Sequence, residues 1–195
     1  MLCFESRLTE QEEKARDEMI YLFNPVLKFI LLNKGYDEFK RYGFNSCRQT
    51  AIFGAFYLRK LLPNYNLHVY EGKFIEKENG IVIPYIHAFI IAEGPNDRQL
   101  IIDISRTTKR LLFTEVYPNI YPNFDDYKNV VKLWEEKIDL DKMINTDEPE
   151  YLTGCKPKNL IQIIETLIED LKTLPKQKQL EFCDKIYSKT TQLRR

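Results

Sequence analysis

The sequence predicts an α+β fold in which helices precede and follow a short antiparallel sheet. Three observations support this prediction. Apolar residues recur at helical spacing near both ends of the chain, and three apolar segments separated by turn residues lie between them. Hydrophobic residues make up 44% of the 195 residues, enough to bury a sizeable core without disulfides or metal ions.

Two helices are expected in the N-terminal part of the chain. Thr9 is followed three residues later by Glu12, a capping box that predicts the start of the first helix. Asn24 and Pro25 interrupt the helical pattern, which predicts that Asn24 caps a second helix and Pro25 takes its first position. This second helix is expected to end before Gly35.

A third helix is expected over Cys47–Leu62. Ser46 and Gln49 form another capping-box pattern at its start, and Pro63 marks its end. Apolar residues occur on several sides of this helix, which predicts that it is largely buried; they are Ala51, Phe53, Ala55, Phe56, Leu58, Leu61 and Leu62.

The next part of the chain predicts three strands, Leu67–Ile75, Ile81–Ala92 and Leu100–Ile104. Turn residues at Lys77–Gly80 and Glu93–Asp97 separate them, so we expect an antiparallel meander. The second strand is apolar on both faces, which predicts a central position in the sheet.

The C-terminal part of the chain is expected to be helical. Asp125–Lys137 is predicted as a helix, and two further helices are predicted to start near Pro157 and Pro175. We therefore expect one domain over residues 1–150 and a helical hairpin over residues 151–195 that packs on the same domain.

Charge and cysteine content argue against several classes of protein. The 29 basic and 29 acidic residues cancel, which gives no support for binding to nucleic acid or a membrane surface. No C-x-x-C pair occurs and the chain has only 2 histidines, so neither a zinc site nor a disulfide framework is expected; the cysteines are Cys3, Cys47, Cys155 and Cys183. No glycine-rich phosphate-binding motif occurs, and no cofactor is expected.

The N-terminal residues are acidic and polar rather than basic and then apolar, so no secretory signal is predicted. No apolar run is long enough to cross a bilayer. The cytoplasm is the expected compartment, and export by a route without a signal peptide stays compatible with the sequence.

Cys47 stands at the predicted N-terminus of a helix. A helix N-terminus carries a partial positive charge and amide groups without intrahelical partners, and both stabilise a thiolate. The same amides can receive the oxyanion that forms during acyl transfer. Taken alone, a cysteine at a helix start is more often a small buried residue.

His87 and Asp103 each lie in an apolar strand, where an imidazole or a carboxylate needs a partner. Because the two strands are expected to be adjacent, Asp103 can hold one nitrogen of the His87 ring and leave the other facing Cys47. Either residue alone is more often structural. Together the three residues predict a cysteine–histidine–aspartate triad, whereas His68 is expected at a strand surface or edge.

Three short segments resemble the transglutaminase-like superfamily of papain-like cysteine enzymes; they are Gly43–Ala51, Tyr85–Phe89 and Leu100–Ser105, with Gly72 after the first strand as a further match. In that superfamily the cysteine opens a buried helix, the histidine precedes a small residue and an aromatic residue, and the aspartate ends the next strand. The resemblance covers residues 42–108. It implies a papain-like core in which the helix that bears Cys47 packs on an antiparallel sheet, with extra N- and C-terminal helices.

The resemblance also bears on the oxyanion site. Beyond the amide of Cys47, the candidate donors are Asn45, Tyr42 and Gln49, of which the first two lie just upstream of the cysteine, where the donor of the superfamily often originates. Many members have tryptophan after the cysteine or after the His-Ala pair, whereas this chain has Arg48 and Phe89. The resemblance therefore implies the fold and the triad rather than one particular reaction.

The predicted function is a cysteine-dependent hydrolase or acyltransferase that acts on an amide bond of a protein or peptide through a thioester at Cys47. His87 would take and return the proton, and Asp103 would orient His87. Two alternatives stay open: a catalytically silent binding or inhibitory module on the same fold, and a structural fold in which the three residues do not meet. No metal ion, nucleic acid or membrane is expected to take part.

Overall fold

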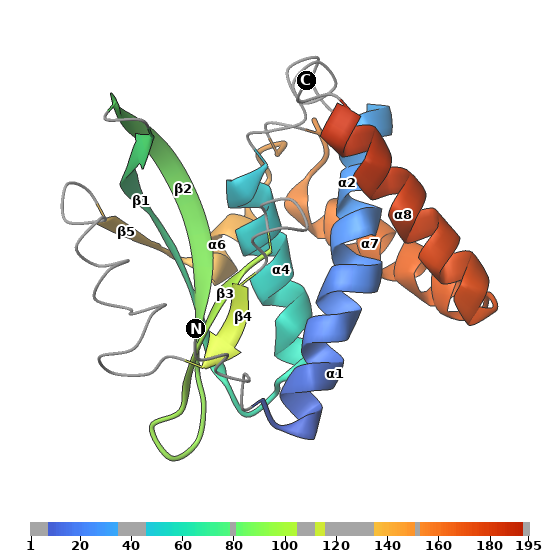
Figure 1. The fold of residues 1–195 in the computed structure, drawn as a ribbon, viewed down its shortest axis with the longest axis horizontal. Coiled ribbons are helices and arrows are strands. Elements are labelled where there is room, and N and C mark those ends of the chain that lie inside the picture. The colour runs from blue at the N-terminus through green and yellow to red at the C-terminus, as the bar shows by residue number, and fades with distance from the viewer. Residues whose placement is uncertain are drawn as a thin grey trace.

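The computed structural model of the protein describes residues 8–34, 46–78, 81–104, 112–115, 135–150 and 153–192. Its elements, in chain order, are α1 (Glu10–Glu18), the π-helix η1 (Met19–Phe23), α2 (Asn24–Lys34), α4 (Cys47–Leu61), β1 (Asn66–Glu78), β2 (Ile81–Glu93), β3 (Gln99–Asp103), β4 (Leu112–Glu115), β5 (Glu135–Ile138), α6 (Leu140–Asn145), α7 (Pro157–Lys172) and α8 (Lys176–Gln192). The long helices lie on one side of the sheet (Figure 1). The predicted α+β class is confirmed.

The first helix starts as predicted. The Thr9 hydroxyl accepts a hydrogen bond from the Glu12 amide at 3.3 Å, and the Glu12 carboxylate accepts one from the Thr9 amide at 2.6 Å, which completes the capping box. The predicted break at Asn24 is wrong, because the chain stays helical through η1 and Asn24 has α-helical backbone angles. The wide π turn tolerates Pro25, which has no N–H to donate and would otherwise clash with the preceding turn.

The helix α4 begins at Cys47 as predicted, but the second capping box does not form. Ser46 has φ −105° and ψ 11° rather than an extended conformation, and its hydroxyl makes no capping hydrogen bond. The Gln49 side chain turns instead to Glu150, with Nε2 donating to Oε1 at 2.6 Å. A contact between residues so far apart in the chain thus replaces the local one.

The sheet is antiparallel, with the strands in the order β4-β3-β2-β1-β5. The three predicted strands are present as the meander β1, β2 and β3, and β2 takes the central position. The β1–β2 ladder runs from Asn66 opposite Glu93 to Glu78 opposite Ile81, which places Gly72 opposite His87. The turn after β2 closes with Asn96 and Asp97 at φ 57° and 58°, the positive φ values at two successive residues that a type I′ turn requires.

The predicted helix over Asp125–Lys137 is wrong where it can be compared. Residues 135–137 belong to β5, in which Ile138 lies opposite Val69 of β1 and is buried. Pairing along the sheet edge and burial of Ile138 therefore outweigh the helical propensity of the charged residues before it. The rest of that predicted helix lies outside the described residues.

The core fills the space between the sheet and the helices. The helix α4 packs directly on β1 and β2, and η1 and α2 pack on α4 (Figure 1). Gly54 permits this close approach, since a Cβ there would lie 3.2 Å from Cε of Met19 and 3.5 Å from Cδ1 of Ile90.

The C-terminal hairpin is formed by α7 and α8 and contributes to the same core. Its buried side chains belong to the hydrophobic cluster that also contains residues of α4 and of the sheet; they include Leu160, Ile164, Ile168 and Ile186. Pro157 takes the first turn of α7, where a missing N–H costs nothing. Among the described helices, none combines the length and apolar character needed to cross a membrane.

Candidate active site

The predicted contact between His87 and Asp103 is present. Nε2 of His87 lies 2.6 Å from Oδ2 of Asp103, and the two residues are only 4% and 3% exposed. His87 lies on β2 and Asp103 ends β3, and the ladder that joins these strands pairs Ile90 with Ile102. Two neighbouring strands thus bring together the polar side chains that each apolar segment could not bury alone.

Cys47 joins this pair from the start of α4. Its thiol is half-buried and shares a hydrogen bond with His87. Because Asp103 occupies Nε2, the ring nitrogen left for the thiol is Nδ1. The helix, the central strand and the strand beside it each supply one residue, as the sequence predicts.

The environment of His87 favours the imidazolium form. Burial alone lowers the pKa of His87, but hydrogen bonds with Asp103 and Cys47, together with the negative charge of these groups, raise it from 6.5 to about 9. His87 is therefore positively charged at neutral pH. A cation beside a cysteine favours the thiolate, which is the nucleophilic form.

An ion pair anchors the first turn of α4 to the sheet. The Arg48 guanidinium pairs with the Glu71 carboxylate on β1, and the Glu71 side chain is almost fully buried. Glu71 lies opposite Ala88, the residue after His87, so the pair holds α4 close to the part of β2 that carries the histidine. This pair is not among the predictions made from the sequence. Val69 and Glu71 are two positions apart and therefore lie on the same face of β1. A carboxylate on the face that buries Val69 indicates a buried partner.

A cavity of about 630 Å³ opens beside the first two turns of α4. Its apolar wall includes Ile52 and Phe53, and the opposite wall comes from α6 and the segment before α7. Gln49 and Glu150, which are hydrogen-bonded to each other, both line this cavity. The carboxylate of Glu150 is also fixed by the amide and hydroxyl of Thr153.

The oxyanion candidates have different outcomes. Gln49 is buried on the first turn of α4, and its Nε2 already donates to Glu150. Tyr42 and Asn45 lie outside the described residues. The first backbone amides of α4, from Cys47 onward, have no intrahelical acceptors and are the donors that the helix itself provides.

The remaining histidine and thiols lie elsewhere. His68 on β1 makes its ring contact with Glu93 at the end of β2, with Nε2 3.0 Å from Oε2, and does not join Cys47, His87 and Asp103. Cys155 and Cys183 are free thiols, and burial raises the pKa of Cys183 to about 11. Within the described residues, no group of three or more cysteine, histidine or acidic side chains is placed to hold a metal ion.

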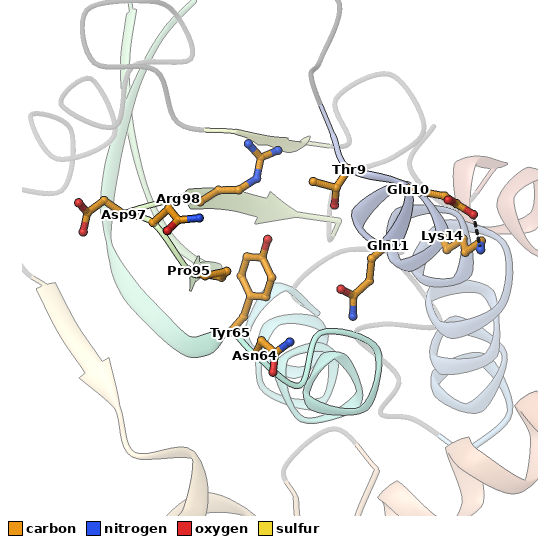
Figure 2. A pocket seen from close by; sticks show the side chains of 10 residues that line it. Thr9, Glu10, Gln11, Lys14, Asn64, Tyr65, Pro95, Asp97 and Arg98 are labelled. Atoms are coloured by element: carbon orange, nitrogen blue, oxygen red, sulfur yellow. Dashed lines mark hydrogen bonds and ion pairs between the residues drawn. The ribbon is translucent and has the colours of Figure 1, made fainter.

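A second cavity, of about 810 Å³, lies between the start of α1, the turn after α4 and the β2–β3 turn. Figure 2 shows Tyr65 and Arg98 among the side chains that line it. Both side chains also hold the buried Glu12 carboxylate, with Tyr65 donating to Oε1 and Arg98 to Oε2 at 2.6 Å each. Neither Cys47 nor His87 lines this cavity, so it is separate from the triad.

Comparison with known proteins identifies no relative of this chain. No family model matches it, and neither a curated protein nor a solved structure does. Any function assigned to this chain therefore depends on the contacts of Cys47, His87 and Asp103 themselves.

Proposed function

We propose that the protein is a cysteine-dependent hydrolase or acyltransferase that acts on an amide bond through a thioester. The supporting observation is the shared contact of His87, which is hydrogen-bonded to Asp103 on one side and to Cys47 on the other. A buried imidazole held in this way has a fixed orientation and carries a positive charge in the resting site, the two properties that a nucleophilic thiol needs from its partner.

In the proposed mechanism the Cys47 thiolate attacks the carbonyl carbon of the amide, and a C–S bond forms as the carbonyl oxygen becomes an oxyanion. The first amides of α4 stabilise that oxyanion. The His87 imidazolium gives its proton to the amide nitrogen, the C–N bond breaks, and an amine leaves. Asp103 keeps the His87 ring oriented while the ring loses its positive charge.

The second half of the reaction releases the acyl group. Neutral His87 takes a proton from a water molecule or an amine, whose oxygen or nitrogen attacks the thioester carbon. The C–S bond breaks, the acid or a new amide is released, and the thiolate–imidazolium pair is restored. The choice between water and an amine decides whether the protein hydrolyses the amide substrate or transfers its acyl group to the amine.

The finer identity of the fold and of the substrate belongs to the same proposal. Placing a cysteine-bearing helix against an antiparallel sheet with a histidine and an aspartate on neighbouring strands is the arrangement of a papain-like, transglutaminase-like core. That resemblance implies a protein or peptide as the substrate. We place this thiol-dependent site in a reducing compartment such as the cytoplasm, where a cysteine stays reduced.

The decisive experiment measures the pH dependence of iodoacetamide alkylation at each cysteine by mass spectrometry. The wild-type protein is compared with His87→Ala, and with His68→Ala as the matched control. We expect Cys47 to react at least about tenfold faster than Cys155 near pH 6, because of these two cysteines Cys47 is the one beside the His87 imidazolium. His87→Ala should abolish this advantage and His68→Ala should retain it.

Equal reactivity of Cys47 and Cys155 in the wild-type protein would contradict the proposal and favour a binding module on the same fold. A second variant tests turnover itself. Cys47→Ala should abolish hydrolysis of amide substrates while leaving the melting temperature nearly unchanged, since the thiol is only half-buried. Retained turnover in Cys47→Ala would remove Cys47 from the mechanism.

A further inference from the structure

We propose that Asn24 is a positioning residue for the triad, which holds the end of β3 so that Asp103 stays on His87, and that Tyr187 of α8 holds Asn24 in turn. The inference rests on the proposed function, because it concerns the geometry of the same site. Through a chain of hydrogen bonds, the C-terminal helix α8 would then help to position Asp103 against His87.

The first step is the contact between Asn24 and the end of β3. Asn24 is fully buried at the junction between η1 and α2, and its Nδ2 donates to the carbonyl oxygen of Ile104 at 2.8 Å. Ile104 directly follows Asp103. The amide of Asn24 therefore restrains the peptide unit next to the residue that carries the orienting carboxylate.

The second step is the position of Asp103 at the end of the sheet ladders. The β2–β3 ladder is paired up to Ile90 opposite Ile102, and the β3–β4 ladder ends at Asp103 opposite Leu112. Ile104 lies past both of these pairs. A hydrogen bond of 2.6 Å between His87 and Asp103 weakens steeply when either partner moves, so the restraint at Ile104 fixes the length of that bond.

The third step links Asn24 to the C-terminal helix. The hydroxyl of Tyr187 accepts a hydrogen bond from Nδ2 of Asn24 at 3.0 Å and donates one to the carbonyl oxygen of Ile20 at 2.9 Å. Tyr187 itself is buried, and α8 packs against α2 and η1. The position of α8 thus determines which way the Asn24 amide points.

Packing alone does not account for asparagine at this position. Oδ1 of Asn24 is buried and accepts no hydrogen bond from any side chain or backbone group in the described part of the chain. An apolar side chain of similar size would fill the same space without burying an unsatisfied oxygen. An apolar side chain lacks the Nδ2 donor that reaches Ile104 and Tyr187. That donor is the group that positions the end of β3.

The test compares Asn24→Leu and Tyr187→Phe with wild type, and uses Tyr57→Phe as the matched control. Tyr57 lies in the same core and donates its hydroxyl proton to Glu18, away from β3. Two readouts report on the site: the rate of Cys47 alkylation near pH 6, and the NMR signal of the His87 ring proton that faces Asp103. Neither readout responds to a loss of stability as long as the protein remains folded.

We expect Asn24→Leu to slow Cys47 alkylation by about tenfold and to shift the His87 proton signal upfield. Tyr187→Phe should produce a smaller change in the same direction, and Tyr57→Phe should leave both readouts at the wild-type values. A wild-type rate and an unshifted proton signal in Asn24→Leu would overturn the inference. If Asn24→Leu does not fold, unchanged readouts in Tyr187→Phe would overturn it.

Different experimental results would contradict the positioning role of Asn24 and the proposed function. If wild-type Cys47 reacts no faster than Cys155, the proposed function fails, and no variant is needed to show it. If wild-type Cys47 is fast and Asn24→Leu is equally fast, the proposed function stands and the positioning role of Asn24 does not.

Discussion

Nε2 of His87 lies 2.6 Å from Oδ2 of Asp103, and both side chains are buried. Burial lowers the pKa of His87, but its hydrogen bonds and charge interactions with Asp103 and Cys47 outweigh burial and raise the pKa from 6.5 to about 9, so the folded protein binds a proton more tightly than the unfolded chain does. Protonated His87 therefore stabilises the fold. That contribution is complete below about pH 6.5 and is lost as the pH rises through about 9.

Asp103→Asn tests this linkage, because asparagine keeps the shape of the side chain and removes its charge. We expect the substitution to lower the free energy of unfolding by about 2 kcal/mol near pH 6. The difference should shrink as the pH rises past about 9, where His87 is neutral in the wild type as well. Urea unfolding of both proteins across this range measures it, and a difference that does not change with pH would contradict the assignment.

The strands and the contact between His87 and Asp103 could be predicted because their signals are local. Alternating and continuous apolar runs separated by turns determine β1, β2 and β3, and a polar residue buried in each of two adjacent strands indicates that the two side chains meet. The start of α4 at Cys47 is likewise predictable, although the predicted capping box does not form there. The Ser46 side chain makes no capping hydrogen bond, and Gln49 bonds Glu150 across the fold.

Features that depend on distant partners could not be predicted. Glu135, Glu136 and Lys137 are charged and locally suited to a helix, and only the pairing of Glu135–Ile138 with β1 makes this segment a strand. Asn24 followed by proline is typical of a helix boundary, yet the side chain of Asn24 serves Ile104 and Tyr187, and a π turn carries the helix past it. These partners lie too far away in the sequence for a local pattern of residues to indicate them.

Glu12 makes stability dependent on acid. Burial alone raises its pKa, but hydrogen bonds from Arg98, Tyr65 and the Thr9 amide, together with the charge of Arg98, lower it to about 2. Ionised Glu12 thus stabilises the fold, fully above about pH 4.5 and less as the pH falls through about 2. We expect Glu12→Gln to lower the free energy of unfolding by about 2 kcal/mol near pH 7, because the partly buried Arg98 guanidinium loses its charged, fully buried partner.

The matched control is Glu10→Gln on the same helix. Glu10 forms an exposed ion pair with Lys14, so its replacement should leave the unfolding free energy unchanged within error. Guanidinium unfolding at several pH values compares the three proteins. The two variants should differ most near neutral pH and converge in strong acid, and equal stability of Glu12→Gln and wild type near pH 7 would refute the role of Glu12.

Two glycines differ in the room around them, which predicts different costs for adding one methyl group. A Cβ at Gly94 would lie 2.3 Å from a ring carbon of Tyr65, and the ring is held by the hydrogen bond from its hydroxyl to Glu12. A Cβ at Gly54 would lie 3.2 Å from the flexible end of Met19. We expect Gly94→Ala to destabilise the protein by at least about 2 kcal/mol.

Gly54→Ala should change stability by no more than about 1 kcal/mol, since the gain in helix propensity offsets the tighter contact with Met19. Thermal unfolding of the two variants measures the contrast. Similar melting temperatures for both would show that the Tyr65 ring moves aside, and the rigid contact at Gly94 would then be rejected.

For the Arg48–Glu71 pair we predict an effect on the stability of the fold without a comparable effect on the reactivity of Cys47. Replacing Arg48 by methionine leaves the Glu71 carboxylate almost fully buried without its cation, which should lower the free energy of unfolding by about 2 kcal/mol. The double variant Arg48→Met with Glu71→Gln should recover much of this loss, giving a coupling energy above about 1 kcal/mol in a double-mutant cycle. Lys60→Met, which removes a more exposed pair with Glu165, is the control and should cost less than about 1 kcal/mol.

The same variant has a clear expectation for the thiol. His87, not Arg48, is the cation hydrogen-bonded to Cys47, and the charge of Arg48 is already neutralised by Glu71. Cys47 alkylation in Arg48→Met should therefore stay within about twofold of the wild-type rate near pH 6, while His87→Ala loses the advantage entirely. A large drop in Arg48→Met, measured under conditions where the variant is fully folded, would mean that the guanidinium shares in stabilising the thiolate.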